Sequence, residues 1–180
     1  LPQLVSSVSV ADVNADGLLD VYFSTYAASM IERIRDFSGL NSAQAQVPLQ
    51  GFMPDKEARI LADKIVSAQF HFYLERPGPP NRIFENRGGG QLVDRSPESG
   101  LGVFKNTYQA AWSDVDLDGD PDLYLANDFS PNTLFINQGH WQFLDQTEAF
   151  GVADFGFGMG VSWGDFDRDG RFDLYVSNMY

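Results

Sequence analysis

Side-chain oxygens recur at alternating positions in three short segments of this chain. Residues 165–173 carry Asp at positions 1, 3, 5 and 9 and Gly at position 6; residues 114–122 repeat the pattern, and residues 12–20 repeat it with Asn14 at position 3. Ca²⁺ is a hard cation that takes about six to eight oxygen ligands, so several must converge from one segment. The alternating spacing permits this convergence, and the glycine permits the sharp turn that follows. The three segments are called the first, second and third loop, in chain order.

Each loop is predicted to bind one Ca²⁺, which gives about three sites. The predicted ligands are the side chains at positions 1, 3, 5 and 9 and the backbone carbonyl at position 7, by analogy with other Asp-rich calcium loops. They are Asp12, Asn14, Asp16, Leu18 and Asp20; Asp114, Asp116, Asp118, Asp120 and Asp122; and Asp165, Asp167, Asp169, Arg171 and Asp173.

An EF-hand, a metal-free turn and a site for a different metal each account for less of the pattern. An EF-hand needs Glu at position 12 and flanking helices, whereas position 12 here is Phe23, Leu125 or Val176 within strand-like runs. Asp-Gly is also a hairpin-turn signal without any metal, but three crowded sets of oxygens would repel one another. Zinc prefers His or Cys, and Mg²⁺ prefers rigid sites that keep water ligands. The pattern therefore favours calcium loops within β-hairpins.

Composition narrows the classes of partner. The chain has 25 acidic and 12 basic residues, a net charge of −13, and 12 of the acidic residues lie in the three loops. Such acidity, with no basic patch to oppose it, argues against nucleic acid and anionic membranes as partners. No apolar run approaches the roughly 20 residues of a membrane span. Without an initiator Met or a visible signal peptide, the sequence is expected to be part of a longer chain.

The loops belong to a repeat of 51 residues. This offset relates Asp114 to Asp165 and also matches several other positions, namely Asn81/Asn132, Asn86/Asn137, Trp112/Trp163 and Tyr124/Tyr175. The second unit divides into four expected strands, over residues 107–113, 123–127, 133–137 and 141–146. Four strands at this period predict β-propeller blades of four antiparallel strands, and the sequence accounts for only part of a propeller.

An insertion interrupts the first unit. Residues 27–80 carry no calcium loop, and Ala58, Leu61, Ile65, Ala68 and Phe72 recur at helical spacing after Pro54. A shorter helix is expected around Met30, Ile34 and Phe37, and residues 77–80 (PGPP) are expected to return the chain to the strands. The fold is thus predicted to be all-β with a helical insertion, divided into residues 1–26 plus 81–180 and residues 27–80.

These residues resemble the FG-GAP/VCBS repeats of calcium-binding β-propellers, with ASPIC/UnbV-type proteins closest. The likeness is carried by residues 112–119, 122–127, 132–137 and 141–145, and it extends over both blade segments but not the insertion. The resemblance implies structural Ca²⁺ between the first two strands of each blade. It also implies an extracellular, periplasmic or cell-envelope location, with the rest of the propeller supplied by further chain.

The predicted function is a non-catalytic module for adhesion or for protein or glycan interaction. His71 and His140 are the only histidines, and neither lies near a nucleophile motif or has metal-ligand spacing. Trp141, which the repeat does not require, is the candidate ligand-contacting residue. The alternative is the propeller part of a secreted carbohydrate-active enzyme, such as a lyase, or a lectin, which the resemblance also permits.

Overall fold

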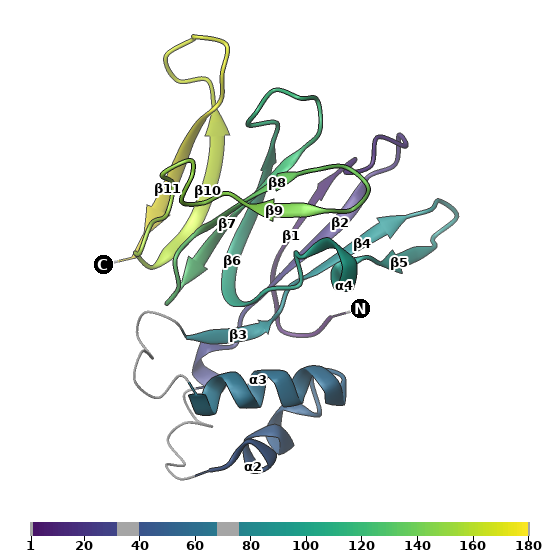
Figure 1. Ribbon diagram of the computed structural model, residues 1–180, viewed down its shortest axis with the longest axis vertical. Coiled ribbons are helices and arrows are strands. Elements are labelled where there is room, and N and C mark those ends of the chain that lie inside the picture. The colour runs from purple at the N-terminus through teal and green to yellow at the C-terminus, as the bar shows by residue number, and fades with distance from the viewer. Residues whose placement is uncertain (1, 32–39, 68–75, 180) are drawn as a thin grey trace.

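The computed structural model describes residues 2–31, 40–67 and 76–179 (Figure 1). Three antiparallel sheets make up most of it. The first has the order β1-β2-β4-β5 and forms the first blade. Its strands are β1 (Val5–Ala11), β2 (Asp20–Thr25), β4 (Arg82–Asn86) and β5 (Leu92–Asp94).

The second sheet has the order β3-β6-β7-β8-β9, and its last four strands form the second blade. A hairpin of two strands follows as the third sheet. β1 contacts β6, and β6 contacts β10, so the strands that precede the three loops lie side by side. The expectation of a partial β-propeller with antiparallel four-stranded blades is confirmed. The strands are β3 (Pro77–Pro80), β6 (Phe104–Ser113), β7 (Asp122–Asp128), β8 (Thr133–Asn137), β9 (Phe143–Asp145), β10 (Gly158–Gly164) and β11 (Asp173–Asn178).

The loops close their hairpins in one common register. Ser113 pairs with Asp122 across β6 and β7, and Gly164 pairs with Asp173 across β10 and β11. The first hairpin has the equivalent pair of Ala11 with Asp20. Position 9 of every loop is therefore the first residue of the returning strand, where the ladder fixes its side chain.

Aromatic side chains pack one blade against the next. The Trp112 ring meets Tyr22 of the first blade edge-on at 6.1 Å, and Trp163 meets Tyr124 of the second at 6.2 Å. Both tyrosines are fully or almost fully buried. Edge-to-face pairs at this spacing are favourable, so the tryptophans that recur 51 residues apart serve the packing between blades.

The insertion lies beyond the ends of the strands opposite to the loops (Figure 1). It contains α2 (Ser42–Gln46), the 3-10 helix η1 (Val47–Leu49) and α3 (Asp55–Ser67). Their apolar faces form a separate core that includes Ala45, Leu49, Ala58, Leu61 and Ile65. Ala58, Leu61 and Ile65, which recur at helical spacing in the sequence, thus form the buried face of α3.

Part of the helical prediction falls outside the described residues, namely Ile34, Phe37, Ala68 and Phe72, as does His71. Met30 lies in a helical stretch over residues 28–31. Neither α2 nor the short α4 (Ser96–Ser99) was predicted, because each spans less than about two helical turns and shows too little periodicity. The proposed division of the chain into two parts stays a prediction.

One predicted strand begins later than expected, and one strand was not predicted. The strand expected over residues 141–146 begins only at Phe143, because His140 and Trp141 adopt positive φ of 53° and 61° in the preceding turn. Residues 77–80 form β3 rather than a linker. At Gly78, an added Cβ would lie 2.4 Å from the carbonyl carbon of Lys105. Prolines suit this position because β3 is an edge strand.

Candidate metal centres

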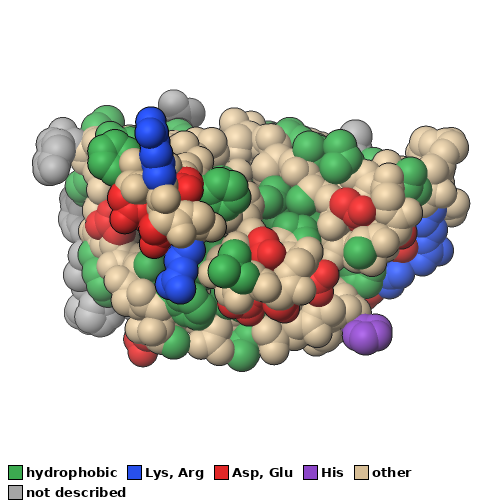
Figure 2. All heavy atoms as spheres, turned by 90° about the horizontal axis from the view of Figure 1, so that it is seen from above, with side chains coloured by type: hydrophobic (Ala, Val, Ile, Leu, Met, Phe, Trp, Pro, Cys, Tyr) green, Lys and Arg blue, Asp and Glu red, His purple; other side chains and the backbone are tan. Residues whose placement is uncertain are grey.

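The three loops lie at one end of the sheets, away from the insertion (Figure 1). Viewed from that end, acidic side chains gather over this face (Figure 2). Among the described residues, two groups of carboxylates have oxygens within 4.8 Å of one another: Asp114, Asp116 and Asp122, and Asp165, Asp167 and Asp173. These are positions 1, 3 and 9 of the second and third loops.

The carboxylate at position 1 shapes each loop. In the second loop, Asp114 accepts hydrogen bonds from the backbone N–H groups of Asp118 at 3.1 Å and Gly119 at 3.0 Å. The equivalent bonds in the other two loops measure 2.8–3.1 Å. One short sequence pattern therefore produces the same backbone frame three times, and the frame turns positions 1 and 3 toward each other.

Position 9 joins the loop to the rest of its blade. Asp122 is fully buried, and its two oxygens accept the N–H groups of Val115 and Asn137, both at 2.8 Å. Asp20 is buried in the same way and accepts from Val13 at 3.0 Å and Asn86 at 2.8 Å. These asparagines end the third strand of each blade. Their repetition is visible in the sequence, but this role was not predicted from it.

The pKa of the Asp122 carboxyl is raised to about 6, chiefly by burial and to a smaller extent by the nearby Asp116 and Asp118 charges, while the hydrogen bonds from Asn137 and Val115 oppose the rise. Burial likewise raises the pKa of Asp20. The pKa of Asp116 is raised by burial first and by Asp118 second. A cation would oppose each of these effects, since it favours the ionised carboxylate.

Position 5 stays a predicted ligand, and its carboxylate has a separate hydrogen-bonding role in the loop. Asp118 and Asp169 lie outside the two carboxylate groups defined by the 4.8 Å limit. Each instead accepts the backbone N–H of position 7 at 2.9 Å. A carboxylate has two oxygens, so this bond leaves the second one able to contact a metal. The position-7 carbonyls remain predicted ligands.

The first loop has an amide where the others have a carboxylate. Asn14 donates from Nδ2 to Asp16 at 3.0 Å, so the amide here faces a neighbouring ligand candidate. An amide oxygen is also a good Ca²⁺ ligand but carries no charge. The donor set of all three loops, made of oxygens alone, fits a hard cation.

Every loop also holds a residue other than glycine in the left-handed region. Ala15, Leu117 and Arg168 at position 4 have φ of 58°, 64° and 65°. Three unrelated residue types at this position gave no sequence signal for it. Side chains with a Cβ adopt this conformation at some cost, so the surrounding hydrogen bonds must hold it.

The remaining sequence candidate, Trp141, lies in the turn before β9. Its ring packs against the core of the first two blades, and the Arg95 guanidinium lies 5.6 Å from the ring centroid. Trp141 lines neither of two cavities in the described structure, one between Glu57 and Arg82 and one between Lys105 and Phe155. Its role in ligand contact stays a prediction. No helix within residues 2–31, 40–67 or 76–179 has the length and apolarity to cross a membrane.

Comparison with known proteins supports the resemblance. Residues 114–176 match the model of the FG-GAP-like repeat, from the second loop into β11. Cartilage acidic protein 1 of Mus musculus is 32% identical over 94 residues, which are 52% of this chain and 15% of that protein. The Xenopus tropicalis protein of the same name is 25% identical over 197 residues, covering 95% of this chain and 30% of the relative. The chain spans less than a third of either relative.

Proposed function

We propose that this chain, which carries an FG-GAP-like repeat over residues 114–176, is a non-catalytic calcium-binding module of a β-propeller. The observation that carries the proposal is the convergence of three carboxylates in each of two loops that share one backbone frame. Ca²⁺ bound there would neutralise like charges that the fold brings together. All fifteen predicted ligands, including position 5 and the position-7 carbonyls, belong to this proposal.

The role proposed for the ion is structural. Each loop joins the first two strands of its blade, and position 9 links the loop to the third strand in the first two blades. Metal held between positions 1, 3 and 9 would therefore fix the hairpin and its junction with the sheet. A site repeated in successive blades suits a common structural need better than a single catalytic step.

We further propose that the module works by binding a protein or glycan partner outside the cytoplasm. The relatives' name refers to cartilage, which supports an extracellular location. Further chain would complete the propeller. A catalytic propeller of a carbohydrate-active enzyme remains the alternative, and product formation from polysaccharides by the full-length protein would distinguish it.

Thermal unfolding with and without a chelator tests the calcium proposal. With free Ca²⁺ about 100-fold above the dissociation constant, each site adds roughly 2.7 kcal/mol, so EDTA should lower the melting temperature markedly. Restoring Ca²⁺ should reverse the loss, and Mg²⁺ should restore less of it. The matched control is the double variant Asp116→Asn/Asp167→Asn, which should respond less to EDTA. An unchanged melting curve together with no Ca²⁺ by metal analysis would refute the proposal.

A further inference from the structure

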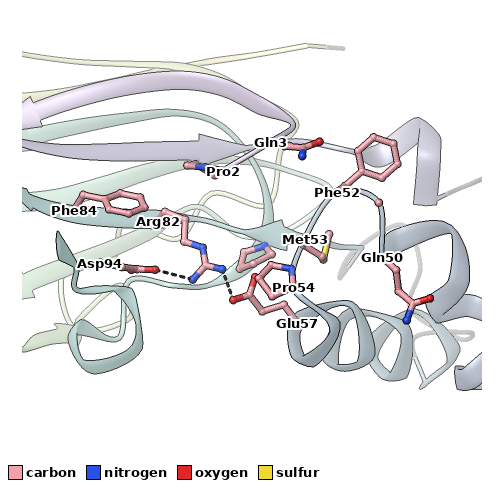
Figure 3. A pocket seen from close by; sticks show the side chains of 12 residues that line it. Pro2, Gln3, Gln50, Phe52, Met53, Pro54, Glu57, Arg82, Phe84 and Asp94 are labelled. Carbon is pink, nitrogen blue, oxygen red and sulfur yellow. Dashed lines mark hydrogen bonds and ion pairs between the residues drawn. The ribbon is translucent and has the colours of Figure 1, made fainter. Parts of the chain in front are cut away.

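A cavity of about 450 Å³ lies where the insertion meets the first blade (Figure 3). The insertion contributes residues 50–54 and Glu57 to its lining, and the blade contributes Arg82, Phe84 and Asp94. Ligand sites commonly have volumes of about 300–1,000 Å³ and combine apolar walls with a few placed polar groups. This cavity has both properties and lies at the opposite end of the sheets from the calcium loops.

A second cavity, of about 540 Å³, occupies the equivalent place in the second blade. The 51-residue offset relates Pro80, Arg82 and Asp94 of the first cavity to Pro131, Thr133 and Asp145 of the second. The groove is thus a feature of the repeat. Among the described residues, the insertion contributes a wall to the first copy alone, and this copy has an arginine in place of threonine, which makes it the specialised one.

The charges of the first cavity are paired internally. Arg82 lies between two carboxylates: it forms an ion pair with Glu57 and lies 3.4 Å from Asp94 (Figure 3). Of the described residues that line this cavity, Arg82 is the one cation. An anionic ligand would have to displace one of these carboxylates, so the cavity disfavours phosphate, sulfate and acidic peptides.

The same cluster offers hydrogen-bonding capacity to a neutral ligand. Glu57 Oε2 is buried and accepts no hydrogen bond from the described residues. A buried acceptor without a donor costs about 1–3 kcal/mol, which a ligand hydroxyl would recover after a small shift of the side chain. Gln3 adds an amide group that both donates and accepts, whereas the Gln50 amide donates to Asp55 at 3.1 Å.

Apolar surface completes the site. Phe52 and Phe84 lie on opposite sides of Arg82 (Figure 3), and Phe52 is 40% exposed. Met53 and Pro54 extend the wall on the insertion side. A sugar ring has C–H faces that pack on such side chains and hydroxyls that exchange hydrogen bonds with planar polar groups. An apolar peptide side chain or a lipid tail would use the apolar walls and leave the polar groups unmatched.

We propose that this cavity binds a neutral saccharide through the insertion and the first blade together. The proposal rests on the partner-binding role given above and is independent of the calcium sites. Arg82 acts as the positioning residue that orients Glu57 and Asp94, while Phe52 supplies the ring-packing surface.

A binding array tests the assignment. It carries neutral oligosaccharides with glucose, galactose, mannose or N-acetylglucosamine ends, and sulfated glycans and cationic and acidic peptides beside them. We expect binding to at least one neutral class, at least ten-fold weaker in Phe52→Ala and in Arg82→Thr, which installs the residue of the second blade. Phe155→Ala at the second cavity should leave binding unchanged. Circular dichroism establishes that each variant is folded.

Absence of binding to every neutral glycan would overturn the proposal, as would binding by sulfated glycans or peptides alone, or binding that Phe52→Ala leaves intact. The calcium proposal is tested separately in the same protein through the EDTA response. If EDTA does not change the melting temperature but the protein binds a neutral glycan, the calcium proposal alone is rejected. If EDTA lowers the melting temperature but no neutral glycan binds, the saccharide proposal alone is rejected.

Discussion

The second and third loops share almost every internal contact and differ in what surrounds them. Position 1 caps the same two N–H groups in both, and position 9 accepts the N–H of position 2 at 2.8 Å in both. Asp122, however, is fully buried against β8, whereas Asp173 is exposed in the two-stranded β10–β11 sheet. The nine residues therefore determine the loop frame, and the third strand determines the electrostatics of its last carboxylate.

The largest effect should come from removing the buried carboxylate. We expect Asp122→Asn to lower the free energy of unfolding in Ca²⁺ by about 2–3 kcal/mol, because it removes a charge that accepts two backbone hydrogen bonds in a buried position. Asp173→Asn should cost much less. Urea unfolding of both variants measures the difference, and equal losses would mean that the third strand adds nothing to the site.

Acidification should lower the Ca²⁺ affinity of the second loop more than that of the third. Burial raises the pKa of Asp122 to about 6, so at pH 5 a metal must displace a proton there, and the apparent Ca²⁺ affinity of the second loop should fall about ten-fold from pH 7. Calorimetry on Asp12→Asn/Asp165→Asn leaves the second loop intact, and calorimetry on Asp12→Asn/Asp114→Asn leaves the third. A fall of equal size in the third loop, where position 9 is exposed, would contradict this account.

Without calcium, the Asp122 carboxyl should stabilise the fold more at low pH than at neutral pH. Since the folded-state pKa of Asp122 lies above the unfolded value, its contribution to stability is present below the unfolded pKa and is lost as the pH rises through about 6. Urea unfolding in EDTA at pH 5 and pH 7, compared with Asp122→Asn, measures this contribution. A contribution that grew with pH would show that the carboxylate is paired in a way the structure does not contain.

Exchanging Asn and Asp at position 3 should change the Ca²⁺ affinity of the first and second loops by a smaller amount and in opposite directions. Asn14→Asp gives the first loop the carboxylate of the second, and we expect its Ca²⁺ affinity to rise by several-fold, up to about ten-fold or 1.4 kcal/mol. Asp116→Asn should lower the affinity of the second loop by a similar factor. Titration calorimetry checks both variants, and no change in either would show that position 3 is not a ligand.

The sequence predicts the features that depend on residues close together in the chain, but not those that depend on contacts between distant residues. The loops, the blade strands and the buried face of α3 come from short-range spacing, and all were predicted. The burial of Asp122 depends on Asn137, fifteen residues away, and the cavity at Arg82 depends on contact with Glu57 in the insertion. The recurrence of Asn86 as Asn137 is visible in the sequence but does not tell which carboxylate the asparagine contacts, and the pairing of Arg82 with Glu57 has no periodic signal. The edge strand Pro77–Pro80 was missed because its proline content indicates a linker unless the neighbouring β6 is known.

The left-handed residue at position 4 gives the smallest expected effect and should be the same in both loops. Leu117 is 62% exposed, so Leu117→Gly removes little packing while relieving a positive φ of 64°. We expect a gain in unfolding free energy of up to about 1 kcal/mol, reduced by the greater freedom of glycine in the unfolded chain. Leu19→Gly is the control, because Leu19 is similarly exposed but lacks a positive φ, and it should lose stability. Arg168→Gly should raise the unfolding free energy by the same amount as Leu117→Gly, since the positive φ belongs to the backbone that the loops share. Urea unfolding measures both variants, and a gain in one loop alone would show that the surrounding blade also determines the backbone conformation at position 4.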